Sequence, residues 1–179
     1  MSIVWLDLET TGLYANKDLI LEVACVVTTD DLIELGRFHA VTDIARGVPL
    51  CTLPRRVQEM HLANGLWLDS LRDGRPVEDI GAELYVFLHD EMQVPKDPKP
   101  LLAGNTISFD RGFVAQHWPE VAGLFHYRDY NVTPLHEFFK GAAPEIYAAA
   151  PGRQAGHRAM ADILSSLENT RYYARSIKP

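Results

Sequence analysis

Apolar and polar residues alternate near the beginning of the chain in the pattern of β-strands. Residues 3–8 alternate and are followed by Thr10-Thr11-Gly12, so they predict a strand that ends in a turn. Residues 19–28 form a second apolar run rich in Val and Ile, and 29–31 suit a hairpin turn before a third strand at 32–41. Because parallel neighbours need longer connections, we expect these three strands to form an antiparallel meander.

Helical periodicity dominates the rest of the chain. Apolar residues at helical spacing predict an amphipathic helix over 77–92, and the Pro-rich segment 95–100 is expected to be a surface loop. The other expected elements are a short helix from Pro54 to Asn64-Gly65, a strand at 101–103, a helix at 110–117, a strand at 130–133, a helix at 134–140, a Gly/Ala/Pro-rich loop at 141–156 and a helix at 159–175. This order predicts an α/β fold in which helices flank a mixed five-stranded sheet.

Length and composition narrow the class of protein. The 179 residues fit a single domain spanning 1–179, and 47% hydrophobic content is ordinary for a soluble protein. No apolar run approaches the ~20 residues that cross a bilayer, and the N-terminus lacks the pattern of a signal peptide. Cys25 and Cys51 are too few for a disulfide framework and lack zinc-motif spacing. We therefore expect a cytoplasmic protein without membrane contact.

The charge balance bears on possible partners. The chain has 17 Lys and Arg against 24 Asp and Glu, a formal charge of −7. A protein that follows a long nucleic-acid backbone usually carries a basic stripe, which this chain does not show. Either it avoids nucleic acid, or it contacts few phosphates and bound cations invert the local charge.

The first candidate for chemistry is the acidic pair Asp7 and Glu9. Residues two apart on a strand share a face, so both carboxylates are expected at the end of a buried, central strand. Two acids there repel each other and are costly to desolvate, which a hard cation with oxygen ligands would offset. The spacing alone is weak in a chain with 24 acids, and Glu9-Thr10-Thr11-Gly12 can also be only a strand exit.

Asp110 is the second candidate. It follows Gly104-Asn105-Thr106-Ile107-Ser108-Phe109, which joins a predicted strand to a predicted helix. Taken alone, Ser108 or Asp110 would be interpreted as a helix cap.

His157 and Asp162 form the third candidate. Their spacing of five does not place them on one helical face. His157 is therefore expected on the loop before the last helix, with Gly152 and Gly156 giving that loop freedom, and Asp162 in the first turns of the helix. A loop histidine is commonly only solvated, but beside a carboxylate it is a candidate general base.

Taken in order, these motifs resemble those of the DEDDh exonucleases, and within them those of the oligoribonucleases. The likeness rests on Trp-Leu-Asp-Leu-Glu-Thr-Thr-Gly-Leu at 5–13, Gly-Asn-x-Ile at 104–107, His-Tyr-Arg at 126–128, and His157-x2-Met160-x-Asp162-Ile163 with Tyr172-Tyr173. Each motif is weak alone, but together they span essentially the whole chain.

The resemblance implies an RNase H-like fold and 3′→5′ hydrolysis of short single-stranded RNA to 5′-monophosphates. It also implies that Asp7, Glu9, Asp110 and Asp162 hold two Mg²⁺ or Mn²⁺ ions, with His157 as general base. Hard oxygen ligands favour these cations over zinc.

Substrate contacts and a homodimer are also implied by the resemblance. Arg128 with Thr133, and Thr106 from the facing subunit, would cap the 5′ phosphate of the substrate. The other residues expected near the substrate are Leu13 as a wedge against a base, His61, Asn105 and Tyr127.

Two positions depart from the family pattern. Arg56 stands where the family usually has tryptophan, and Asn131 where it usually has aspartate. The first puts base stacking in doubt, although a guanidinium can stack instead. The second departure would alter the dimer contact or the phosphate cap.

Other functions stay open at the level of sequence. A related exonuclease acting on single-stranded DNA, of the proofreading type, would use the same residues. A non-catalytic nucleic-acid-binding domain is a further alternative, but it would leave several carboxylates together without a purpose. A phosphodiesterase of small molecules is also conceivable, because a dinucleotide is nearly one.

Overall fold

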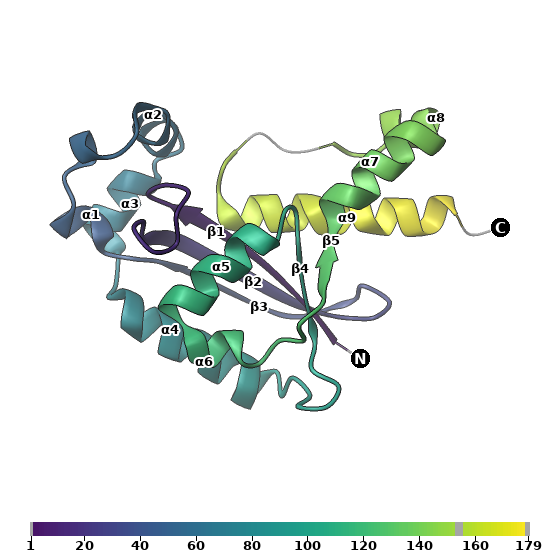
Figure 1. Cartoon of the computed structure of the whole chain (residues 1–179), viewed down its shortest axis with the longest axis horizontal. Helices are drawn as coiled ribbons and strands as arrows, with labels where there is room; N and C mark the ends of the chain where they lie inside the picture. The colour runs from purple at the N-terminus through teal and green to yellow at the C-terminus, as the bar shows by residue number, and fades with distance from the viewer. Residues whose placement is uncertain (1, 153–155, 178–179) are drawn as a thin grey trace.

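The computed structural model describes residues 2–152 and 156–177, and its centre is a five-stranded mixed sheet (Figure 1). The strand order is β3-β2-β1-β4-β5. β2 pairs antiparallel with β1 and β3, whereas β4 pairs parallel with β1 and β5. The predicted meander and mixed sheet are confirmed. The strands are β1 (Ser2–Thr10), β2 (Ile20–Thr29), β3 (Glu34–Val41), β4 (Leu101–Gly104) and β5 (Asp129–Asn131).

Helices cover both faces of this sheet and one of its ends. α4 and α5 pack on one face, α9 packs on the other, and α1, α2 and α3 gather at one end (Figure 1). No helix within the described ranges is both long and apolar enough to cross a membrane. The helical segments are α1 (Ile44–Gly47), η1 (Leu50–Thr52), α2 (Arg55–Ala63), α3 (Leu66–Asp73), α4 (Val77–Val86), η2 (Phe87–Glu91), α5 (Ser108–His117), α6 (Pro119–Ala122), α7 (Val132–Ala142), α8 (Pro144–Ala148) and α9 (Ala159–Ser176).

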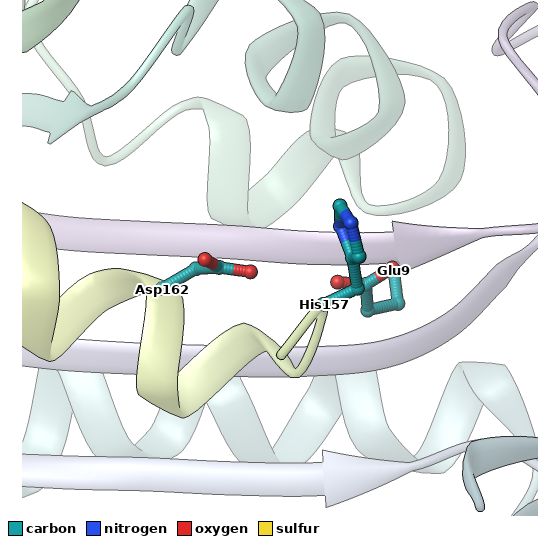
Figure 2. Close-up of side chains that lie close together, drawn as sticks. All are labelled: Glu9, His157 and Asp162. Atoms are coloured by element: carbon teal, nitrogen blue, oxygen red, sulfur yellow. The ribbon is translucent and has the colours of Figure 1, made fainter. Parts of the chain in front are cut away.

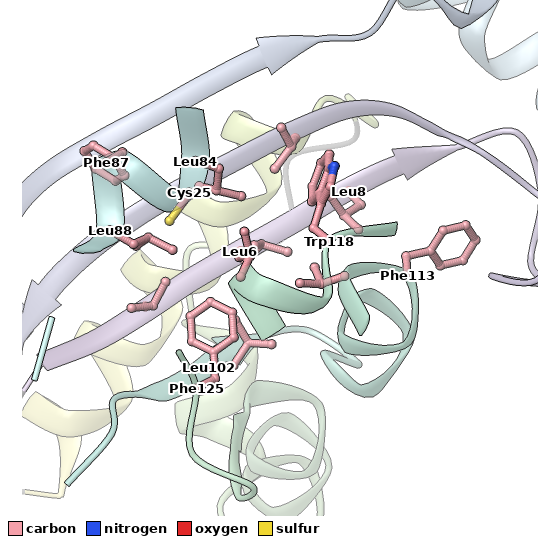
Figure 3. Close-up of a cluster of buried hydrophobic side chains, with 14 of the residues drawn as sticks. Leu6, Leu8, Cys25, Leu84, Phe87, Leu88, Leu102, Phe113, Trp118 and Phe125 are labelled. Carbon is pink, nitrogen blue, oxygen red and sulfur yellow. The ribbon is translucent and has the colours of Figure 1, made fainter. Parts of the chain in front are cut away.

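The central strand β1 is covered on both sides, because different layers pack on its alternate residues. Leu6 and Leu8 belong to the core shared with α4, η2 and α5 (Figure 3). Trp5 belongs to the core shared with α9. Since side chains two apart on a strand share a face, Asp7 and Glu9 lie on the Trp5 side, under α9. The fold therefore places two acids where a core strand ends.

Several element boundaries differ from the predicted ones. The third strand begins at Glu34 rather than at residue 32, because Leu32 has a φ of 63° and belongs to the turn. The helix predicted over 77–92 is present as α4 and η2. In η2 the hydrogen bonds widen to the π pattern, with Met92 N donating to the Phe87 carbonyl at 2.8 Å.

The strand predicted at 130–133 is wrong in its second half. Asn131 ends β5 and caps α7, its side chain accepting a hydrogen bond from Thr133 N at 3.1 Å. Val132 and Thr133 are therefore helical, and α7 begins before the predicted 134–140. Val132 and Thr133 are β-branched and favour a strand, but the cap formed by Asn131 starts a helix at this point instead.

Among the described residues, four α-helices and the short η1 were not predicted. α1, α6 and α8 have four or five residues, too few to show a helical period, and α3 has eight. α8 lies within the loop predicted at 141–156, so that prediction is wrong there. Residues 153–155 of the same loop lie outside the described residues.

Candidate active site

The exit of β1 supplies the first two carboxylates. Glu9 is 7% exposed and pairs in register with Glu22 of β2, while Asp7 is half-buried and pairs with Ala24. The Asp7 and Glu9 side chains both project to the face of β1 on which α9 packs, so this layer covers them. The predicted placement of Asp7 and Glu9 on one face of a central strand is confirmed.

Asp110 reaches the same place from the opposite layer. It lies in the first turn of α5 and is 3% exposed, and its Oδ1 accepts a hydrogen bond from Leu8 N of β1 at 2.9 Å. Burial raises the pKa of Asp110 to about 7, against the opposing effect of the Leu8 N–H. Asp110 thus joins α5 to the end of β1, which a cap confined to its own helix would not do.

His157 and Asp162 come from the segment that leads into α9. His157 lies two residues before the helix and is exposed, and Asp162 lies in the first turn with 4% exposure, both as predicted. Glu9, His157 and Asp162 each offer one ligand atom, and these atoms lie within 4.8 Å of one another. Figure 2 shows this cluster, with Glu9 on the strand and the other two on the α9 segment.

A cleft of about 360 Å³ collects these side chains. All five predicted catalytic residues line it, together with three of the predicted substrate contacts. Its lining is Asp7, Leu8, Glu9, Thr10, Gly12, Leu13, Val57, Met60, Asn105, Thr106, Phe109, Asp110, His157 and Asp162.

This lining suits a divalent cation. Glu9, Asp110 and Asp162 are nearly buried, and ionised carboxylates in such a place are costly unless positive charge compensates them. Carboxylate oxygens, with one imidazole nearby, are hard donors of the kind that Mg²⁺ and Mn²⁺ accept.

The other four predicted contacts, His61, Tyr127, Arg128 and Thr133, are not part of the cleft lining. His61 is fully buried, and its Nε2 donates to the Thr10 carbonyl at 3.0 Å. Burial lowers the pKa of His61, so the ring is neutral and supports the end of β1. Tyr127 is 76% exposed, with the Arg128 guanidinium 5.3 Å from its ring centre.

The two threonines of the expected phosphate cap contact each other within one chain. The cap with Thr106 from the facing subunit stays a prediction. Thr106 N donates to Thr133 Oγ1 at 2.9 Å, and the two hydroxyls lie 3.1 Å apart. The cap of α7 also brings Asn131 to this point, and its Oδ1 accepts from Thr106 N at 3.2 Å. The nearby Asn105 is held by α9, donating to Ser166 Oγ at 2.6 Å.

Comparison with known sequences decides the family. The family described as Exonuclease matches residues 4–170. An oligoribonuclease of Tropheryma whipplei is 37% identical over 171 residues, covering 96% of this chain and 90% of the relative. An oligoribonuclease of Streptomyces griseus is 34% identical over 174 residues, covering 97% and 85%.

The chain belongs to the oligoribonuclease family of exonucleases.

Solved structures agree with this family at the level of fold. A zinc-bound exonuclease I–single-stranded DNA complex from E. coli aligns with a TM-score of 0.70 at 14% identity, over 98% of this chain and 41% of the other. Exonuclease I of Methylocaldum szegediense gives a TM-score of 0.65 at 20% identity, over 99% and 41%. The chain thus spans about two fifths of the length of these neighbours, and it shares the RNase H-like fold expected from its motifs.

The two departures from the oligoribonuclease pattern have different structural consequences. Asn131 presents an amide oxygen to the N–H groups of Thr106 and Thr133, as an aspartate would present a carboxylate oxygen. Arg56 is exposed and does not line the cleft, whereas Val57 and Met60 of α2 do. The apolar lining that accompanies Leu13 therefore includes residues that the sequence analysis did not predict, although their spacing of three on a helix was a usable signal.

Proposed function

We propose that this chain is a 3′→5′ exoribonuclease that removes 5′-monophosphates from short RNA. The observation that carries the proposal is the cleft itself. It brings Asp7, Glu9, Asp110, His157 and Asp162 together in a chain that belongs to the oligoribonuclease family. Folding alone does not require acidic residues of β1, α5 and α9 to gather at one point, because together they repel one another. The domain proposed to carry out this chemistry is the whole of 1–179.

The four carboxylates would hold two divalent cations, Mg²⁺ or Mn²⁺. When bound, such ions supply activation of the attacking water and neutralisation of charge at the scissile phosphate and leaving 3′-oxygen. The carboxylates of Asp7, Glu9, Asp110 and Asp162 supply the oxygen donors from three directions. Because Glu9, Asp110 and Asp162 are buried, their oxygens are fixed before any ligand arrives.

His157 would act as the general base. Its imidazole is exposed beside Glu9 and Asp162, so it can reach a water molecule at the scissile phosphate. A neutral ring nitrogen takes the proton of that water as the water attacks. The proton then leaves to solvent, which the exposure of the ring permits.

The apolar part of the cleft would receive the terminal base. Leu13 is 74% exposed at the β1–β2 loop, and it shares the cleft with Val57 and Met60 of α2. Such a wall contacts the face of a base and offers no hydrogen-bonding group to its edge. We therefore expect little discrimination among the four bases. The charge of −7 fits a substrate held by few phosphates.

The test of this function uses 5′-labelled RNAs of two to seven nucleotides with Mg²⁺. Wild-type protein is expected to shorten them from the 3′ end, fastest at the shortest lengths, and His157→Ala to reduce kcat by about 10²-fold. A longer single-stranded DNA is the comparison substrate. Faster turnover of that DNA would replace this proposal with the proofreading-type alternative, and inert wild-type protein would contradict nuclease activity altogether.

We also propose that two chains complete each site. Tyr127 and Arg128 are predicted substrate contacts, yet neither lines the cleft of its own chain. In a homodimer they would reach the 5′ phosphate held near Thr106 and Thr133 of the partner.

The cytoplasmic location expected from the sequence is also part of this proposal. It is consistent with the two cysteines, which are both free thiols.

A mixing experiment tests the shared site. His157→Ala and Arg128→Ala proteins should each be poorly active, and exchange of their subunits should restore activity. The mixed dimer has one site with both an intact His157 and the other chain's Arg128. Sedimentation of the single variants confirms their assembly, and a mixture no more active than the average of its parts would contradict a site completed in trans.

A further inference from the structure

The buried carboxylate of Glu22 has no part in the proposed chemistry, although it lies beside Glu9. The two residues are opposite each other on β2 and β1, so their side chains project to the same face. Glu22 is 1% exposed and accepts hydrogen bonds from Arg158 Nε at 3.0 Å, Ala159 N at 2.9 Å and His39 Nε2 at 2.7 Å. Burial alone would raise the pKa of Glu22, but these donors hold it below its ordinary value. Glu22 is thus ionised, and both of its oxygens accept hydrogen bonds from other parts of the chain.

Arg158 connects this carboxylate to two further elements. Its Nη1 donates to Asp69 Oδ2 of α3 at 2.9 Å and to the Asn64 carbonyl at the end of α2 at 3.3 Å. The planar guanidinium fixes these directions together, which a lysine could not do. The residue that follows His157 is therefore fastened to β2, α2 and α3 at once.

His157 itself has a backbone conformation that needs such support. Its φ is 45°, in the left-handed region that residues with a Cβ rarely adopt. Its carbonyl accepts a hydrogen bond from Asn64 Nδ2, and Asn64 Oδ1 accepts from Leu66 N at 3.0 Å, which orients the amide. Three consecutive residues are thus held by three contacts: His157 through its carbonyl, Arg158 through its side chain and Ala159 through its N–H.

We propose that Glu22, Arg158 and Asn64 form a clamp that positions His157 for its role as general base. None of the three lines the cleft, so they are positioning residues that act through His157. The inference rests on the proposed function, because it assigns them an effect on proton transfer. This role differs from a general anchoring of α9. Anchoring alone would stabilise the fold but would not affect the position of His157 more than that of other side chains.

The far half of α9 offers a matched control. Arg171 donates from Nε at 3.1 Å and from Nη2 at 2.6 Å to the Leu32 carbonyl in the β2–β3 turn. It is a partly buried arginine that anchors the same helix to the same side of the sheet. Losing it should cost stability without moving His157.

The experiment compares Arg158→Met with Arg171→Met on a two-nucleotide RNA, with thermal unfolding of each protein. We expect Arg158→Met to lower kcat roughly 10- to 100-fold, since small misplacements of a reacting group cost this much, while KM stays within about threefold. Arg171→Met should change kcat by less than about twofold even where its melting temperature falls as far. Equal losses of kcat in the two variants would overturn the clamp. If Arg158→Met does not fold, Asn64→Ala removes the contact to the His157 carbonyl, together with the one from Leu66 N, while keeping Arg158, and decides by the same comparison.

A double-variant test asks whether the clamp acts through His157. In the His157→Ala background, Arg158→Met should lower kcat by less than about threefold, because the positioned group is already gone. The same loss in both backgrounds would contradict the proposal.

A measurement without metal or substrate separates this inference from the proposed function. The side-chain NMR signals of His157 should shift or broaden in Arg158→Met and stay unchanged in Arg171→Met. An undisturbed His157 signal in Arg158→Met would refute the clamp, whereas inactive wild-type protein with the expected NMR change would refute only the exonuclease.

Discussion

Asp110→Asn is expected to lower kcat on a two-nucleotide RNA by about 10³- to 10⁴-fold while leaving the fold intact. The asparagine Oδ1 can still accept the hydrogen bond that Leu8 N donates at 2.9 Å, so the contact between α5 and β1 survives. What disappears is one of the four negative charges that would bind the cations, and several kcal/mol of transition-state stabilisation depend on them. Single-turnover cleavage at saturating Mg²⁺ or Mn²⁺ measures the loss.

The neighbouring Arg111 supplies the control for this substitution. It lies one residue further along α5, and its Nε donates to Asp129 Oδ1 at 2.8 Å, away from the cleft. Arg111→Lys should therefore disturb packing near Asp110 without removing a proposed ligand. An Asp110→Asn protein within about tenfold of the wild-type kcat would remove Asp110 from the metal site.

Without metal ions, the wild-type protein is expected to lose stability as the pH rises from about 4 to about 7. Burial raises the pKa of Asp110 from 3.8 to about 7, so the native state keeps a proton that the unfolded chain releases across this window. Stability from this group is full below the unfolded pKa and is lost as the pH rises through the folded one. Three pH units correspond to at most about 4 kcal/mol in the free energy of unfolding.

Urea unfolding in EDTA between pH 5 and pH 8 checks this expectation. Asp110→Asn has no proton to lose at this position, so its unfolding free energy should exceed that of wild type by an amount that grows with pH. Added Mg²⁺ should close the gap by stabilising only the wild type. A difference that is independent of pH would show that Asp110 titrates normally in the folded protein.

The placement of the two proposed metal ligands on β1 could be predicted because its signal is local. Strand periodicity over a few residues places Asp7 and Glu9 on one face, whatever the rest of the chain does. Asp110 and His157 could be recognised only together with the others, since Asp110 taken alone would be interpreted as a helix cap and His157 as a solvated histidine. The family resemblance provided this link, because it groups all five residues in one site.

The clamp could not be predicted in this way. Glu22 lies in an apolar run, and its meaning depends on Arg158, 136 residues away in the sequence. The contribution of Val57 and Met60 to the cleft was not predicted, because the face that α2 turns toward the cleft depends on how that helix packs. Contacts between residues far apart in the sequence, and the side from which a helix packs on the cleft, depend on tertiary packing. Neither the periodicity of apolar residues nor the spacing of motifs predicts them.

The distance along the chain between β1 and α9 has a consequence for synthesis. A ribosome that has made Asp7 and Glu9 must add about 150 further residues before His157 and Asp162 exist, which takes roughly 8–30 s at common elongation rates. Through that interval the nascent chain has Asp7 and Glu9, and later Asp110, but neither its proposed base nor its last carboxylate. In the proposed mechanism, hydrolysis therefore begins only after α9 has been made and has packed on β1.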